Sequence, residues 1–304
     1  MLETERRGSP GVYLGDVTRP GPDDSIRVQG MVLPRRHPTI LFGDGGTAKS
    51  YTALYLLGTL AKAGVRVALF DWELDGEDHR DRLERIFGPQ MPQILYMKCE
   101  QPLFYECDRL SRAVREWHLQ YAVYDSVAFA CDGPPESAEI AGKYFRAVRQ
   151  VGVGSLHIAH ITKGENGDRK PFGSSFWHNG ARSTWYCKAA EDIPNSKSLE
   201  IGIFNRKNNL GGVHHPVGFQ ISFSEESTVF ARSEPANSEE LAIQIPIRQR
   251  MQYILRRGAL MPAALADEIG ADLDTISRTI RRHKSLFVVL KDGQVGLSER
   301  HSSD

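Results

Sequence analysis

The 304-residue sequence lacks the features that mark several classes of protein. Its four cysteines show neither a Cys-x-x-Cys pair nor the Cys/His spacing of a structural zinc site. It has no run of roughly 18 apolar residues, so it predicts no membrane-spanning helix and no membrane partner. Residues 1–24 are rich in charge, proline and glycine and lack the apolar centre of a signal peptide. We therefore expect reduced thiols, a cytoplasmic location and a flexible segment over 1–24.

The sequence also lacks an excess of either sign of charge. Lysine and arginine number 38, aspartate and glutamate also number 38, and the formal net charge is zero. This balance excludes a uniformly basic protein, so a nucleic-acid surface would have to come from local clusters. The hydrophobic content of 40% supports a substantial core. The length predicts a main domain of about 200–250 residues and a small second domain.

A glycine-rich segment lies between the apolar run 39–42 and an apolar segment of helical character at 51–57. A strand, such a loop and a helix are the context of a phosphate-binding P-loop, or Walker A motif. Backbone N–H groups of the loop and the helix N-terminus would hold phosphates. Lys49 would reach the β/γ-phosphates and Ser50 would bind Mg²⁺, so we expect ATP and Mg²⁺ as cofactors. Ala48 stands where the pattern has glycine, and its methyl group is a small intrusion. The predicted nucleotide-binding residues are Gly43, Asp44, Gly45, Gly46, Thr47, Ala48, Lys49, Ser50 and Tyr51.

Strands alternate with helices in the pattern that follows. Apolar runs predict strands over 65–70, 94–97, 119–124 and 155–160, and helical spacing predicts helices over 77–87, 107–118 and 144–151. This alternation predicts an α/β fold with a parallel sheet that helices cover on both faces. Three further strands, over 184–188, 199–204 and 217–223, have no long helices between them. They predict a meander that extends the sheet.

A second domain is predicted near the C-terminus. Residues 224–245 are polar and are expected to form a linker. Helices over 246–257, 262–269 and 272–283 and a hairpin with an Asp-Gly turn follow, which is the order of a winged helix-turn-helix over 246–298, with a tail at 299–304. Asp272 or Asp274 would cap the third helix. Its apolar face is predicted at Leu273, Ile276 and Ile280. The predicted DNA contacts are Arg278, Arg281, Arg282 and Lys284; the alternative is a protein-interaction module with a solvated basic helix.

Polar residues follow three of the predicted strands, and the ends of parallel strands meet at one edge of a sheet. Asp125 would support Mg²⁺ as the Walker B carboxylate. Glu73 would polarise the attacking water as a general base. The alternative for Glu73 is that it and Asp71 only cap the turn. His160 is the candidate sensor of the γ-phosphate, although a lone histidine is more often structural.

The order of these motifs resembles the RecA-type ATPase core, with the motifs at 43–50, 70–73, 123–126 and 158–164. Within that group, residues 25–223 are most similar to the RepA-like branch of hexameric replicative helicases, which includes phage-encoded members. The resemblance implies a hexamer with ATP at subunit interfaces and single-stranded DNA in a central channel. Residues 172–175 with 179–182 resemble the mobile DNA-facing loop of that branch and the segment after it. Loops 129–139 and 164–179 would line the channel, with phosphates held by Lys163, Arg169 and Lys170.

The resemblance also implies cations that act on the nucleotide of a neighbouring subunit. Segment 204–211 resembles the hairpin that carries them, so Arg206 and Lys207 are the first candidates and Arg182 is the third. The expected function is an ATP-hydrolysing, DNA-dependent motor in replication or recombination. A recombination mediator or strand-exchange ATPase is one alternative, and a non-motor DNA-binding regulator switched by ATP is another. A circadian-type or signalling relative is less favoured, because the sequence has no second P-loop and no internal repeat.

Overall fold

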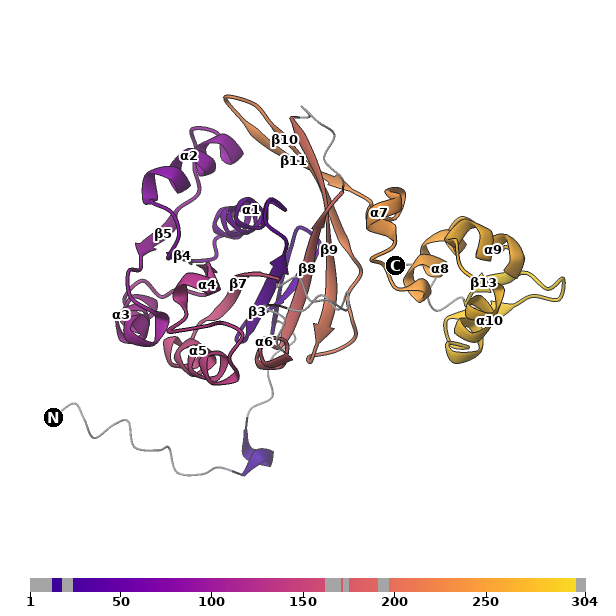
Figure 1. Cartoon of the computed structure of the whole chain (residues 1–304), viewed down its shortest axis with the longest axis horizontal. Coiled ribbons are helices and arrows are strands. Elements are labelled where there is room, and N and C mark those ends of the chain that lie inside the picture. The colour runs from indigo at the N-terminus through magenta and orange to yellow at the C-terminus, as the bar shows by residue number, and fades with distance from the viewer. Residues whose placement is uncertain (1–12, 18–23, 162–170, 172–174, 191–196, 299–304) are drawn as a thin grey trace.

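A nine-stranded sheet forms the centre of the computed structural model, which describes residues 13–17, 24–161, 171, 175–190 and 197–298 (Figure 1). Its strands are β3 (Pro38–Gly43), β4 (Val67–Asp71), β5 (Ile94–Lys98), β6 (Tyr121–Asp125), β7 (Gly154–His160), β8 (Ser183–Ala189), β9 (Ser198–Asn208), β10 (Val217–Phe223) and β11 (Thr228–Ser233). The strand order is β11-β10-β9-β8-β3-β7-β6-β4-β5. All pairs from β8 to β5 are parallel, and β9, β10 and β11 continue the sheet antiparallel. The predicted α/β fold with a mostly parallel sheet and a terminal meander is confirmed.

Helices cover both faces of this sheet. One face carries α1 (Lys49–Lys62) and α2 (Gly76–Phe87), and the other carries α3 (Leu103–Glu116), α4 (Val127–Ala130), α5 (Ala138–Val151) and α6 (Ser175–Gly180). Neighbouring residues of one strand enter opposite layers: Leu41 packs in the α1 layer, whereas Phe42 packs in the α5 layer. Because both faces are covered, β3, β4 and β6 are buried along their whole length, which explains their continuous apolar runs. No helix in the described ranges is long and apolar enough to cross a membrane.

A hairpin before the P-loop strand was not expected from the sequence. It consists of β1 (Ser25–Val28) and β2 (Met31–Pro34), which pair antiparallel. Gln29 and Gly30 form its turn, and both have positive φ, 47° and 80°. Two such residues suit the twist of a two-residue hairpin turn. Its buried apolar side chains add to the α1 layer.

The predicted linker over 224–245 holds ordered elements instead. Residues 228–233 form β11, which pairs with β10, and they are followed by η2 (Pro235–Asn237) and α7 (Glu239–Ala242). Phe230 of β11 stacks on Tyr55 of α1, with ring centroids 4.3 Å apart and planes 8° apart. Leu241 of α7 is fully buried. The sheet and its packing therefore extend beyond residue 223, where the sequence analysis ends the main domain.

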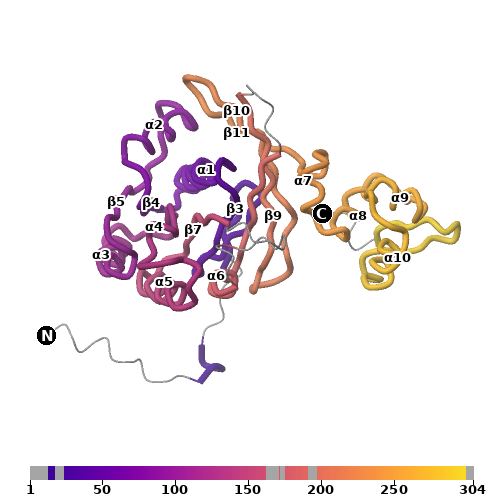
Figure 2. Tube along the Cα trace, viewed as in Figure 1, coloured from indigo at the N-terminus to yellow at the C-terminus, as the bar shows by residue number. Residues whose placement is uncertain are grey.

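The C-terminal residues form a separate small group, which Figure 2 shows beyond β9 and α7. It contains α8 (Ile247–Leu255), α9 (Pro262–Ile269), α10 (Leu273–Arg282) and a two-stranded sheet of β12 (Phe287–Val289) and β13 (Val295–Leu297). Its core is built on Met251, Leu265 and Ile276. Asp272, not Asp274, caps α10, because its carboxylate accepts the N–H of Thr275 at 2.7 Å. Leu273 is 50% exposed and does not belong to this core, so its predicted place on the apolar face is wrong: it lies in the first turn of α10 and faces solvent.

Candidate functional site

The P-loop connects the end of β3 to the start of α1. A Cβ at Gly43 would lie 2.2 Å from the carbonyl oxygen of Cys187 on β8, so the strand can approach its neighbour only with glycine at this position. Gly46 has φ of 75°, a left-handed conformation that glycine adopts without a steric penalty. Both glycines are thus needed for the backbone path of the loop.

Ala48 has the least expected backbone of the loop. Its φ of 54° and ψ of 30° place it in the left-handed region, directly before α1. For a residue with a Cβ, this conformation costs about 1–2 kcal/mol. The sequence predicts that Ala48 departs from glycine through its methyl group, whereas the left-handed backbone of this residue carries the cost of the departure.

Lys49 is the first residue of α1 and is only 5% exposed. Its Nζ donates to the carbonyl oxygen of Asp44 at 2.6 Å and lies 3.3 Å from the Thr47 hydroxyl oxygen. Burial lowers the pKa of Lys49, while the nearby Cys187 and Asp125 oppose that shift. The ammonium group is therefore held inside the curve of the loop, where the P-loop prediction requires it.

Asp125 ends β6 beside the loop and is 3% exposed. Burial raises its pKa to about 6, while a hydrogen bond from Ser50 opposes the shift. Its Oδ1 is buried and has no hydrogen-bond partner among the described residues. A buried carboxylate oxygen without a donor, next to a serine hydroxyl, fits the oxygen-rich ligand set of Mg²⁺. The described residues hold no group of three or more His, Cys, Asp or Glu side chains that could bind a metal ion by itself, so the remaining ligands would come from phosphates and water.

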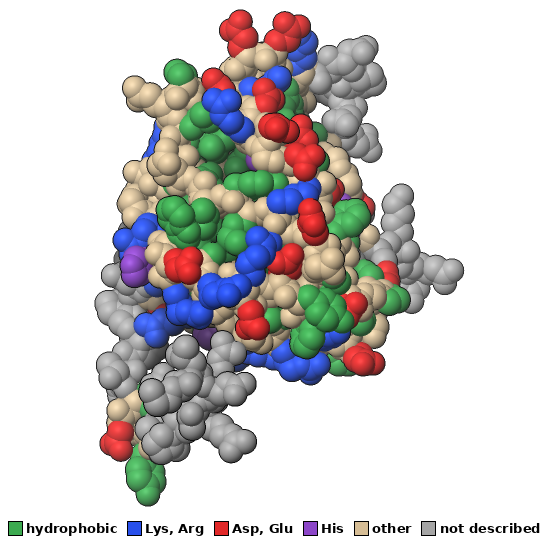
Figure 3. Space-filling model, turned by 90° about the vertical axis from the view of Figure 1, so that its left-hand side faces the viewer, with side chains coloured by type: hydrophobic (Ala, Val, Ile, Leu, Met, Phe, Trp, Pro, Cys, Tyr) green, Lys and Arg blue, Asp and Glu red, His purple; other side chains and the backbone are tan. Residues whose placement is uncertain are grey.

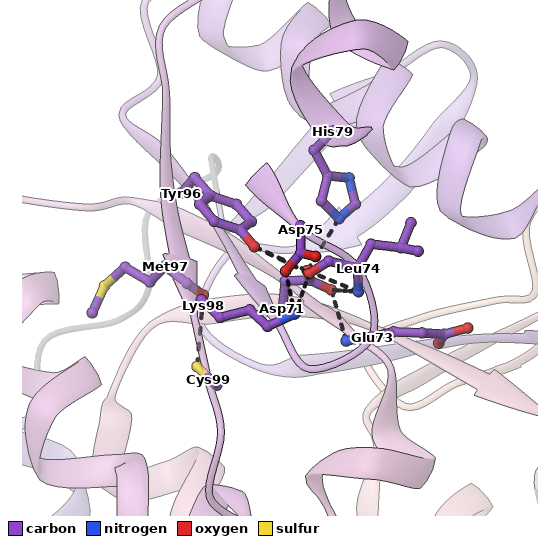
Figure 4. Close-up of polar contacts among 9 residues, drawn as sticks. All are labelled: Asp71, Glu73, Leu74, Asp75, His79, Tyr96, Met97, Lys98 and Cys99. Atoms are coloured by element: carbon purple, nitrogen blue, oxygen red, sulfur yellow. Dashed lines mark hydrogen bonds and ion pairs between the residues drawn. The ribbon is translucent and has the colours of Figure 1, made fainter. Parts of the chain in front are cut away.

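Asp71 and Glu73 have different surroundings (Figure 4). Asp71 is fully buried, and its carboxylate accepts the backbone N–H groups of Glu73 and Leu74 at 3.1 Å each. Glu73 is exposed and lines the same cleft as the P-loop. The sequence left two roles open for these carboxylates, capping the turn and facing the site. Asp71 caps the turn, and Glu73 faces the cleft. The catalytic role of Glu73 stays a prediction.

His160 ends β7 and lines the cleft as well. Burial and the nearby Lys49 lower its pKa. His157, three residues earlier on the same strand, is fully buried and hydrogen-bonds to Tyr144 and Ser155 at 2.8 Å each. The strand thus carries one structural histidine and one that faces the cleft.

The cleft has a volume of about 250 Å³ and lies where β3, β4, β6 and β7 end, which we name the carboxyl edge. One charged residue there was not predicted from the sequence. Arg82 of α2 lines the cleft, with its guanidinium 4.8 Å from the ring centroid of Tyr51. No local motif marks Arg82, because its place depends on how α2 packs beside the P-loop.

The three predicted trans-acting cations lie at the other end of the strands, which we name the opposite edge. Arg182 directly precedes β8, its N–H donates to the carbonyl of Pro38 at the start of β3, and its side chain is exposed. Lys207 donates to the carbonyl oxygens of His178 and Ala181 at 2.6 and 2.9 Å, at the end of α6. None of these cations is therefore placed at the cleft of its own chain.

Arg206 is the extra residue of a β-bulge, since Lys207 pairs with Thr184 and Asn205 with Trp185. Bulges often redirect a side chain. The Arg206 guanidinium donates to the backbone oxygen of Gln244 at 3.0 Å and to its side-chain oxygen at 2.8 Å. In this conformation Arg206 is bound within its own chain.

The predicted DNA contacts are only partly within the described residues, because Lys163, Arg169 and Lys170 lie outside them. The helical residues at both ends shorten the predicted loop 129–139 to 131–137. Arg278 forms an ion pair with Asp274, and Arg281, Arg282 and Lys284 are exposed. The face over α2, β5 and α3 carries both signs of charge among hydrophobic patches, without one dominant basic field (Figure 3).

Comparisons with known proteins identify the fold. No protein-family model matches the sequence, and no curated protein matches it. A KaiC-like protein of the hyperthermophilic archaeon Pyrococcus horikoshii OT3 is similar in structure, with a TM-score of 0.51 and 15% identity over 66% of this chain and 91% of that chain. A DnaB-like replicative helicase, whose structure was described with its interactions with primase, gives a TM-score of 0.51 and 12% identity. This chain has a RecA-like fold.

The RecA-like match covers 66% of this chain but only 59% of the helicase chain. At 12–15% identity these likenesses establish the fold alone. The particular RepA-like branch and the winged helix stay predictions.

Proposed function

We propose that this chain is a Mg²⁺-dependent ATPase of the helicase type that acts on DNA in replication or recombination. The observation that carries the proposal is the convergence of Lys49, Ser50, Asp125 and Glu73 in one cleft of a RecA-like fold. These side chains come from three separate segments of the sequence, and each belongs to a type that phosphoryl transfer requires.

Each residue has a distinct task in this proposal. The loop amides and Lys49 bind the β/γ-phosphates, and Ser50 with Asp125 holds the metal ion. Bound Mg²⁺ would neutralise the charge that develops on the β- and γ-oxygens. Glu73 orients the attacking water and accepts its proton. His160, on the next strand, would contact the γ-phosphate.

The proposal includes a homo-oligomer, which we expect to be a hexamer with single-stranded DNA in a central channel. It is supported by the position of Arg182, Arg206 and Lys207 at the opposite edge, too far around the sheet to serve their own cleft. A cation that a neighbouring subunit brings to the cleft can supply about 10³-fold in rate.

We further propose that α8 to β13 form a winged helix that binds duplex DNA. The element order and the exposed cations of α10 support this assignment. The rival function is a non-motor regulator, in which this unit binds DNA and ATP only switches assembly. Deletion of residues 246–304 should leave basal ATP hydrolysis intact and should weaken duplex binding. The share of the duplex affinity that the deletion removes should be the share that falls steeply as salt is added. Unchanged duplex affinity would assign the unit to a protein partner.

The deciding experiment measures steady-state ATP hydrolysis of the full chain with and without single-stranded DNA. Glu73→Gln should bind ATP normally and hydrolyse it at least ~100-fold more slowly, the scale of a general base. Lys49→Ala, which removes the phosphate contact, should lose affinity as well as turnover. A slow rate that single-stranded DNA does not change would favour the regulator, and near-normal hydrolysis by Glu73→Gln would remove Glu73 from the mechanism.

A further inference from the structure

We propose that His79 is a positioning residue for Glu73 and acts through Asp71. The proposal rests on the proposed function, since it assigns Glu73 the role of general base. Figure 4 shows the network: Asp71 lies between the turn that carries Glu73 and two side chains from outside that turn, His79 and Tyr96. Asp71, His79 and Tyr96 all lie outside the P-loop and outside the Walker B strand.

Asp71 connects the turn to the neighbouring elements. From the turn, it accepts the backbone N–H groups of Glu73 and Leu74. From outside, its Oδ2 accepts the Tyr96 hydroxyl of β5 at 3.2 Å, and it lies 3.3 Å from Nε2 of His79, in the first turn of α2. One carboxylate thus ties the turn to both β5 and α2.

The charge on Asp71 explains why the outside donors matter. Asp71 is fully buried and His79 is 6% exposed, so water does not replace a missing donor easily. Burial alone would raise the pKa of Asp71, but the contacts with His79, Glu73 and Leu74 outweigh it and hold the pKa below its ordinary value. The carboxylate is therefore ionised at neutral pH and depends on those donors for its place.

Few contacts other than the backbone of the turn hold the Glu73 carboxylate in position. Its side chain is exposed, and no hydrogen bond to its carboxylate occurs within the described residues. The backbone of the turn therefore determines where the carboxylate lies in the cleft. A general base must stay within hydrogen-bond reach of its water, and a misplacement of about 1 Å can lower the rate ~100-fold. Loss of the His79 contact should therefore affect turnover more than binding of ATP.

A second cavity, distinct from the P-loop cleft, adjoins the network. It has a volume of about 220 Å³ and is lined by His79 and Tyr96 together with apolar side chains such as Leu83 and Met91. Neither ring nitrogen of His79 forms a hydrogen bond of full geometry among the described residues: Nε2 keeps its 3.3 Å ion-pair contact with Asp71, and Nδ1 has no contact of this kind. The cavity gives an added small molecule access to the position of the imidazole ring, which makes chemical rescue possible.

The test compares two variants of His79 in the full chain. His79→Leu keeps much of the volume and removes the donor, so kcat should fall ~10- to 100-fold while the Kd for ATP stays within about twofold. His79→Gln offers an amide donor in place of Nε2 and should keep kcat within about threefold of the wild type. Equal losses of kcat in both variants, or none in His79→Leu, would overturn the proposal.

Three further measurements separate positioning from a general loss of structure. Arg85→Ala removes an exposed i,i+4 pair with Asp81 on the same helix and should leave kcat unchanged. Imidazole should restore kcat to His79→Ala, and N-methylimidazole, which lacks an N–H donor when neutral, should not. If His79→Leu does not fold, Tyr96→Phe provides the second removal of an Asp71 donor and should also lower kcat selectively.

The double variant decides whether His79 acts through Glu73. Residues that act as one unit are not additive, so His79→Leu should slow the Glu73→Gln enzyme by less than about twofold. A full further loss would show that His79 acts elsewhere and would overturn the proposal. The proposed function fails separately, because a wild-type chain without ATP hydrolysis, or an active Glu73→Gln variant, would contradict it before His79 is tested.

Discussion

The charged side chains at the two edges of the central sheet differ in their burial and in their hydrogen-bond partners. At the carboxyl edge, Asp125 is buried with one oxygen that has no donor among the described residues, and burial lowers the pKa of Lys49. At the opposite edge, Lys207 caps α6 and Arg206 is bound to Gln244. The first edge thus holds buried charged groups around a cleft, whereas at the second edge Arg206 and Lys207 donate to oxygens of their own chain. A cation that serves a neighbouring subunit must either be free already or leave such contacts.

This contrast changes the order of the candidates for the trans-acting cation. Arg182 is exposed, and its charge is close enough to Lys207 to help burial lower the pKa of that lysine. The two residues favoured by the sequence have contacts to give up, whereas the side chain of Arg182 forms no hydrogen bond or ion pair with the residues that the structure describes. We therefore expect Arg182 to contribute first.

The largest expected effect is on turnover in trans. Arg182→Ala should lower kcat by ~10³-fold, and mixing it with Asp125→Asn should restore part of the activity, because some mixed interfaces combine an intact cleft with an intact cation. The same mixing with Arg206→Ala and Lys207→Ala tests the other candidates. Activity per subunit that stays constant down to a demonstrable monomer would contradict every trans-acting cation.

The next effect concerns pH at the carboxyl edge. With a pKa of about 6, Asp125 is mostly ionised at pH 7.5 and mostly protonated at pH 5. The affinity for ATP with Mg²⁺ should therefore fall ~10-fold over that range through this group, with proton release on binding between pH 5 and 6. Calorimetry in buffers of different ionisation enthalpy measures the release. Asp125→Asn should bind weakly at every pH and release no such proton.

The raised pKa of Asp125 also determines how the free energy of unfolding of the ligand-free chain changes with pH. The pKa of Asp125 in the folded chain lies above its ordinary value of 3.8, so the folded state binds the proton more tightly than the unfolded state. The contribution of Asp125 to the free energy of unfolding should therefore decrease as pH rises from about 4 to about 6. Comparing urea unfolding of wild type and Asp125→Asn over this range checks it.

The smallest expected effect is at Ala48. Glycine there removes the left-handed penalty but adds freedom to the unfolded chain, so Ala48→Gly should raise the free energy of unfolding by about 0.5–1 kcal/mol. Ala63 is the matched control, because it is exposed at the other end of α1 with φ of −83°. Ala63→Gly should lower stability by a similar amount. A destabilising Ala48→Gly would mean that the methyl group makes contacts that outweigh the backbone cost.

Local signals made the carboxyl edge predictable. The P-loop, the polar ends of β4, β6 and β7, and the alternation of strands and helices are all patterns of neighbouring residues. The division between Asp71 and Glu73 was not, because it depends on Tyr96 and His79 from two other elements. Arg82 reaches the cleft for a similar tertiary reason.

The opposite edge and β11 were harder to predict. The contacts of Arg206 and Lys207 come from residues 26 or more positions away, and no short pattern contains them. β11 is an outer strand whose only fully buried residue is Thr228, so it has no apolar alternation to identify it. The polar sequence that suggested a linker is what an edge strand with solvent on most sides requires.

The strand β11 also limits the reach of the C-terminal unit. Only residues 234–246 separate the end of β11 from α8. Even if η2 and α7 unfolded, this segment would span at most about 45 Å. A duplex of that length contains about 13 base pairs. On the proposed function, any duplex held by the C-terminal unit must therefore begin within little more than one helical turn of DNA from the outer strand of the ATPase sheet, which sets the spacing that a fork substrate has to offer.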